Sequence, residues 1–183
     1  MLSLEHCSIE VQAYSANDLG TPSYGFVKLN AVSVWRGSYY GTYRNFRGVN
    51  IILVDPSGCS VHESRHFDTC DPAQSNAATE LSSYLQQMGR FYIIVGVTGD
   101  EPSYQLHAAL PALREIGVDV GDVQYRGSFA FVAQSGYQPR PCFVRFLPRT
   151  RVIRIQHTAT SPLQVRSFTC TVLKNVYPFL FAL

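Results

Sequence analysis

The order of local sequence patterns constrains the fold most, because strand-like stretches fill both ends of the chain and only two helix-like segments interrupt them. Apolar residues recur at helical spacing from Ala77 to Met88 and again from Leu106 to Ile116. Between these segments, Phe91–Val97 is apolar on both faces, which predicts a central strand. This order favours an α+β sandwich over a doubly wound nucleotide-binding fold, and the sequence has no G-x-G-x-x-G or P-loop motif.

Glycine and proline mark where the two predicted helices end or weaken. Gly89 and Gly117 follow the last periodic residues and suit helix C-termini. Pro111 lies inside the second segment, where a missing N–H and a ring clash disrupt a regular helix. We therefore expect the second helix to be kinked or restricted to part of its segment.

Further strands are predicted on both sides of the helices. Ser8–Val11 and Gly25–Trp35 predict two early strands. Asn50–Val54 and Cys59–Phe67 predict a β-hairpin, because the intervening Asp-Pro-Ser-Gly favours a tight turn in which Pro presets φ and Gly permits a positive φ. Additional short strands are expected at Val118–Tyr125, Ser128–Val132, Cys142–Leu147, Val152–Gln156 and Val165–Val172.

Length and composition indicate a globular chain with one principal domain. The 183 residues are 46% hydrophobic and only 15% charged, which excludes a disordered chain. The net charge of +2 does not favour nucleic acid as a partner. Arginines crowd together after Pro148, so we predict a domain over residues 1–147 and a C-terminal extension over residues 148–183.

Targeting features are not evident at either end. The first residues carry no basic and apolar segments of a secretory signal. The apolar ending VYPFLFAL is far shorter than the roughly 20 residues that a membrane-spanning helix needs, so membrane insertion is not expected.

The five cysteines point to disulfides more than to metal. None of them forms a C-x-x-C pair, so their spacing does not predict a zinc or thioredoxin-like site. Two disulfides and one free thiol suit an oxidising compartment, and the odd thiol suits a disulfide-linked dimer. The alternative is a set of buried, unpaired cysteines in a reducing compartment. The residues are Cys7, Cys59, Cys70, Cys142 and Cys170.

Catalytic and metal sites find no support in the motifs. His62 and His66 would stand roughly 13 Å apart along one strand, too far to share an ion. Candidate hydrolase residues occur without a G-x-S-x-G elbow or a local signature of a cysteine nucleophile, so we expect no enzyme, metal or cofactor. These candidates are Ser128, Ser135, Cys142 and His157.

A cluster of arginines offers a separate hypothesis. It would bind an acidic polysaccharide or phospholipid head groups, whereas the simpler alternative is a solvated basic edge. The residues are Arg140, Arg145, Arg149, Arg151 and Arg154.

Four ordered stretches carry a family resemblance. They are Arg47–Ile51, Asp55–Gly58 followed by His66–Thr69, Gly99–Glu101, and Tyr125–Val132. Together they resemble the interleukin-like EMT inducer and PANDER-like domain, which occurs in secreted cytokine-like proteins, in the stem of protein O-mannose N-acetylglucosaminyltransferase and in hyaluronan-related cell-surface proteins. The resemblance covers roughly Ser8–Leu147.

The resemblance implies a compact domain of two mostly antiparallel sheets with about two flanking helices, in an extracellular or secretory-pathway lumen location. It implies a non-catalytic module that binds a glycan or glycoprotein. The alternative is a cytokine-like module that acts through a protein receptor. The implied ligand-binding residues are Arg47, Asp100, Arg126 and Phe129, where guanidinium and carboxylate groups would bind sugar hydroxyls and the aromatic ring would stack. Alternatively, Arg47 and Arg126 pair with Asp68, Asp100 or Glu101 and hold loops together.

Overall fold

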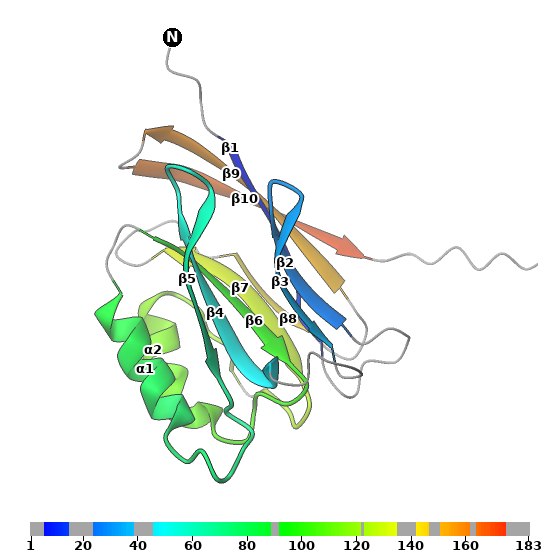
Figure 1. The fold of residues 1–183 in the computed structure, drawn as a ribbon, viewed down its shortest axis with the longest axis vertical. Coiled ribbons are helices and arrows are strands. Elements are labelled where there is room, and N and C mark those ends of the chain that lie inside the picture. Colours follow the sequence, from blue (N-terminus) through cyan, green and yellow to red (C-terminus); the bar gives the residue numbers. More distant parts are fainter. Residues whose placement is uncertain are drawn as a thin grey trace, which may run out of the picture.

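The computed structural model describes residues 6–14, 24–38, 46–88, 92–121, 123–134, 142–146, 151–161 and 164–174. Two antiparallel sheets lie face to face, and the helices cover the outer face of one of them (Figure 1). The layers are therefore sheet, sheet and helix. This arrangement confirms the predicted α+β class.

The first sheet joins the two ends of the sequence. Its strand order is β10-β9-β1-β2-β3, and each neighbouring pair is antiparallel. The central strand β1 therefore pairs with β2 on one side and with the late strand β9 on the other. The bounds are β1 His6–Gln12, β2 Tyr24–Leu29, β3 Val32–Ser38, β9 Arg151–Ser161 and β10 Gln164–Lys174. The last two contain the strands predicted at Val152–Gln156 and Val165–Val172.

The second sheet is built from the middle of the sequence. Its order is β5-β4-β6-β7-β8, again antiparallel throughout. β4 and β6 are buried along nearly their whole length, which confirms the central strand predicted from Phe91–Val97. The bounds are β4 Gly48–Asp55, β5 Ser60–Phe67, β6 Ile93–Gly99, β7 Ser128–Gln134 and β8 Cys142–Phe146.

Alternation of side chains along the strands creates two cores. On β4, Ile52 and Val54 point into the space between the sheets, where they meet Val11 and Val27 of the first sheet. The alternate residues point toward the helices and form a second apolar cluster with Leu81. The helix-facing β4 residues are Val49, Ile51 and Leu53.

The helices follow the predicted segments closely. α1 spans Ala77–Gln87, and its stripe of buried side chains is the predicted one. The second segment divides into the 3₁₀ helix η2, Leu106–Ala109, and the short helix α2, Leu110–Glu115, with Pro111 in the first turn of α2. Pro111 therefore limits the regular helix, as expected. Gly117 ends it at a φ of +81°. Gly89 lies outside the described residues.

One early strand prediction was wrong in its extent. Gly25–Trp35 is a hairpin of β2 and β3 rather than one strand. The turn residues Asn30 and Ala31 both have positive φ, which is the backbone geometry that joins two-residue hairpins. Ala31 has none of the usual sequence signals for this conformation, so the turn was not evident.

Two other local predictions also need correction. Val118–Tyr125 forms no strand over its described residues, although Val118 and Val120 are buried. In the hairpin between β4 and β5, the positive φ belongs to Cys59 rather than to Gly58.

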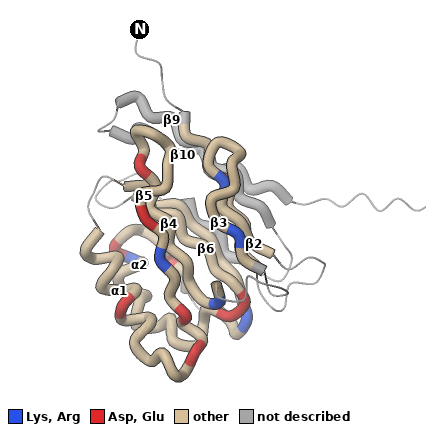
Figure 2. The backbone as a smooth tube through the Cα atoms, in the orientation of Figure 1, with Lys and Arg blue, Asp and Glu red and all other residues tan. Residues whose placement is uncertain are grey.

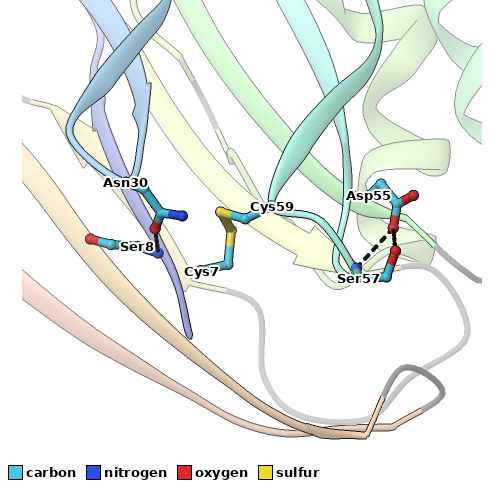
Figure 3. The surroundings of a disulfide bond; sticks show 6 residues. All are labelled: Cys7, Ser8, Asn30, Asp55, Ser57 and Cys59. Atoms are coloured by element: carbon cyan, nitrogen blue, oxygen red, sulfur yellow. Dashed lines mark hydrogen bonds between the residues drawn. A yellow bond between two sulfur atoms is a disulfide. The ribbon is translucent and has the colours of Figure 1, made fainter. Parts of the chain in front are cut away.

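A disulfide fixes this unusual turn residue to the other sheet. Cys7 of β1 is bonded to Cys59, so the bridge connects the two sheets across the sandwich (Figure 3). Nearby, the Ser8 N–H donates to Asn30 Oδ1, and Asp55 Oδ1 accepts hydrogen bonds from the Ser57 N–H and hydroxyl. The β2–β3 turn and the β4–β5 turn are thereby held beside β1.

Candidate functional site at the end of the second sheet

Antiparallel pairing brings the four sequence stretches that carried the family resemblance to one place. β4 and β7 begin at the end of the sheet where β5 and β6 finish, as the pairs Val49–Phe67 and Gly48–Gly99 show. The residues flanking these strand ends form what we call the strand-end cluster, and Figure 2 shows acidic and basic positions gathered there. Its members are Arg47, Asp68, Asp71, Asp100, Glu101 and Arg126.

Arg47 is held by a bidentate ion pair with Asp68. Arg47 Nε lies 3.0 Å from Asp68 Oδ1, and Nη2 lies 2.8 Å from Oδ2. Nη2 also lies 3.7 Å from an Asp71 carboxylate oxygen. The hydrogen bond to Asp68 raises the pKa of Arg47 above its ordinary value. The alternative in which Arg47 pairs with an acidic loop residue is therefore confirmed for Asp68.

Asp68 also organises the loop that follows β5. Its carboxylate accepts hydrogen bonds from the backbone N–H groups of Cys70 and Asp71, at 3.2 and 3.1 Å. On the neighbouring strand, a ring nitrogen of His66 is hydrogen-bonded to the Arg47 carbonyl oxygen at 2.6 Å. The Arg47 backbone and side chain are therefore both fixed to the end of β5.

Asp100 sits at the end of β6 in a left-handed backbone conformation, with φ at +56°. Partial burial raises the pKa of its carboxyl, while the Arg126 and Arg47 guanidinium groups act in the opposite direction. The same carboxylate adds to the effect of burial in raising the pKa of the Tyr14 hydroxyl. Asp100 is thus a strained, partly desolvated acceptor near two cations.

Replacing Asp100 by Asn is expected to increase stability more at about pH 7 than at about pH 3.5. Because the folded-state pKa of this carboxyl is raised, the folded state binds the proton more tightly. Its contribution to stability therefore falls as pH rises from the unfolded-state pKa through the folded-state pKa. Asn removes that fall and tolerates positive φ. Urea unfolding of parent and variant at both pH values tests this, and a difference that does not grow with pH contradicts it.

Glu101 ties two loops of the cluster together. It is only 2% exposed, yet its carboxylate accepts hydrogen bonds from the Ser103 N–H at 2.6 Å, from the Ser103 hydroxyl and from the Arg126 N–H. Such bonds satisfy the oxygen atoms of a buried carboxylate. Glu101 therefore fixes the Arg126 backbone, which also has a positive φ of +57°.

The Arg126 side chain is placed differently from that of Arg47. Its guanidinium carbon lies 5.2 Å from the centre of the Tyr125 ring. Among the residues that the structure describes, the Arg126 guanidinium has no salt bridge. Tyr125 is 66% exposed, so this pair offers a cation and an aromatic face to solvent.

Phe129 does not belong to this surface. Its side chain is 0% exposed and forms part of the core beneath the helices. Side chains of β7 point alternately into the two cores, and that of Phe129 points toward the helices. The Phe129 ring is therefore not available to stack on a ligand. The exposed ring is that of Tyr125, which lies in the same sequence motif but was not selected from it.

The remaining candidates give no second site over the described residues. His62 stacks on Tyr92 at 4.3 Å between ring centres, and no metal-binding group of side chains occurs in the described ranges. Cys70 has a free thiol whose pKa is raised by burial. Ser135 and the arginines Arg140 and Arg149 lie outside the described residues, as do the side chains of Cys142, Arg145, Arg151, Arg154, His157 and Cys170.

No helix among the described residues has both the length and the apolar character needed to cross a membrane. The apolar ending VYPFLFAL lies outside the described ranges.

Fold and site together define a β-sandwich module with one helical layer and a charged loop cluster at one end. Residues 47–137 match the family described as interleukin-like EMT inducer, and the chain thus contains a domain of that family. The match begins at Arg47 and includes every member of the strand-end cluster. The domain is a module of a generally non-catalytic family. No curated protein matches the chain.

Proposed function

We propose that the strand-end cluster binds a sugar unit of a glycan or glycoprotein, and that the chain works as a non-catalytic binding module. The observation that carries the proposal is the combination of Asp100, Arg126 and Tyr125 at one sheet end. A carboxylate accepts hydrogen bonds from sugar hydroxyls, a guanidinium donates to sugar oxygens, and a tyrosine ring can stack on the apolar face of a sugar.

The rest of the cluster supplies rigidity to this proposed site. Asp68 positions Arg47, and Glu101 positions the Arg126 backbone. A site whose polar groups are already ordered loses less entropy when a ligand binds. Asp68 already pairs with Arg47, whereas the side chains of Asp100 and Arg126 form no salt bridge among the described residues. One acidic and one basic group of opposite charge support recognition of a neutral sugar.

A glycan array with matched variants tests the proposal. The parent is expected to bind N-acetylglucosamine-bearing or related glycans, and Arg126→Gln and Asp100→Asn are each expected to weaken binding about tenfold. Arg114→Gln is the control, because Arg114 is an exposed cation that pairs with Asp119 away from the cluster. Thermal unfolding confirms that each variant is folded. Absence of glycan binding by the folded parent, or equal binding by all variants, contradicts the proposal.

A second candidate is a cytokine-like or other protein-interaction module that acts through a protein receptor. The exposed rings of Tyr104 and Tyr125 favour it, because tyrosine is enriched among the energetically important residues of protein interfaces. A folded parent that binds no glycan but loses a cell-surface protein partner on Tyr125→Ser substitution would select this candidate.

We also propose an extracellular or secretory-pathway lumen location. The disulfide between Cys7 and Cys59 supports it, since such bonds persist in oxidising compartments. The family match supports it independently.

A further inference from the structure

The outer face of the first sheet carries a hollow that is separate from the strand-end cluster. It has a volume of about 300 Å³ and is lined by Tyr24, Phe26 and Lys28 of β2 and by Arg36 of β3. This volume lies at the small end of the range for sites that hold small ligands. All four lining residues belong to regular strands, so the backbone beneath the hollow is rigid.

The floor of the hollow is an aromatic ring that belongs to neither core. Val27 and Trp35 point into the space between the sheets, so Phe26 and Arg36 point away from it. Phe26 is nevertheless only 8% exposed, because Tyr24 and Lys28 flank it on the outer face. Tyr24 is 41% exposed and forms an aromatic wall.

The charge on this face is positive. β2 and β3 contain Lys28 and Arg36 and no acidic residue, and Figure 2 shows basic positions on both strands. Lys28 lies 4.6 Å above the Phe26 ring and pairs with Glu10 of β1 at 3.6 Å. The exposed Arg36 donates from Nε to the Ser33 hydroxyl, and within the described ranges its guanidinium has no carboxylate partner.

We propose that this hollow binds a carboxylate carried on a six-membered ring, either an acidic sugar or an aromatic acid. Arg36 would receive the carboxylate through its remaining N–H groups, which can donate in the fork geometry that carboxylates accept. The ring would lie against Tyr24 and the Phe26 edge. Lys28, already paired with Glu10, contributes positive potential rather than the primary contact.

Four small-molecule probes distinguish the contribution of the carboxylate from that of the ring, and an acidic sugar from an aromatic acid. Amide chemical shifts of the isotope-labelled protein are followed during titration with glucuronate, benzoate, glucose and acetate at low salt. Saturable shifts centred on Tyr24, Phe26 and Arg36 are expected with glucuronate, benzoate or both. Glucuronate alone identifies an acidic sugar, and benzoate alone identifies an aromatic acid. Glucose has the ring without the charge, and acetate has the charge without the ring, so neither should match these shifts.

Variants then assign the contact. Arg36→Gln is expected to weaken binding about three- to tenfold, whereas Arg114→Gln leaves it unchanged. Arg36 is exposed, so its replacement should not affect folding, and an unchanged unfolding temperature checks this. The proposal is overturned if neither ring acid shifts these amides, if glucose or acetate shifts them equally, or if Arg36→Gln behaves like Arg114→Gln. Shifts at Tyr125 instead report on the strand-end cluster, so the two proposals succeed or fail separately.

Discussion

Removing the disulfide by the double substitution Cys7→Ala and Cys59→Ala is expected to lower the free energy of unfolding by about 4 kcal/mol. The bond closes a loop with a sequence separation of 52, and a crosslink over such a length greatly restricts the unfolded chain. It also anchors Cys59, a turn residue with positive φ, to the central strand β1. Urea unfolding of parent and variant measures the difference.

The control for this prediction is Cys70→Ala. Cys70 has a free, half-buried thiol. Its replacement by Ala should lower the free energy of unfolding by at most about 1 kcal/mol. Reductant should lower the unfolding midpoint of the parent by more than that of the double variant. If the double variant loses no more stability than Cys70→Ala, the crosslink does not stabilise the sandwich as argued.

Gly48→Ala is expected to destabilise the protein by about 3 kcal/mol or more. Gly48 has φ at +96°, where a residue with a side chain is strained. A Cβ there would also lie 2.3 Å from the Phe67 carbonyl oxygen and 2.7 Å from the Thr69 nitrogen, and backbone atoms cannot move aside cheaply. Urea unfolding again gives the size of the loss.

Gly58→Ala provides the matched comparison. Gly58 lies in the open β4–β5 turn without positive φ, and an added Cβ would meet only the Ser60 hydroxyl at 3.4 Å. Its replacement should change stability by less than about 0.5 kcal/mol. Similar losses for the two variants would show that the close approach at Gly48 is not responsible. Because Gly48 follows Arg47 directly, the first variant should also weaken any ligand binding at the strand-end cluster.

The fold was predictable where hydrophobic periodicity was long. The apolar stripe of α1 and the apolar runs Ile51–Val54 of β4 and Ile93–Val95 of β6 are local signals, and the structure contains all three elements. The β2–β3 hairpin was not predicted because Ala31 adopts a positive φ, and alanine is not a residue type that favours this conformation. Val118–Tyr125 reads as a strand in the sequence because buried loop residues such as Val118 and Val120 produce the same apolar pattern as a strand.

The candidate site was predictable only in part. Arg47, Asp100 and Arg126 were selected from sequence motifs, and the sheet topology brings their backbones to one end. The sequence predicted the β4–β5 hairpin but not which side chain meets Arg47 at its end, so it could not decide between ligand contact and pairing with Asp68. The burial of Phe129 could not be predicted either, because the helices cover the face of β7 on which it lies, and this packing is not evident from the strand's own sequence.

The position of β1 has a consequence for folding kinetics. Its partner β9 follows every strand of the second sheet in the sequence, so one side of β1 stays an unpaired edge until the whole second sheet has been translated. Contacts of such large sequence separation slow folding, because the entropy of closing the loop is lost before the strand pairing stabilises the chain. Nascent chains should therefore carry an open strand edge on β1 until β9 has been translated, and chaperone engagement should be most valuable before that point.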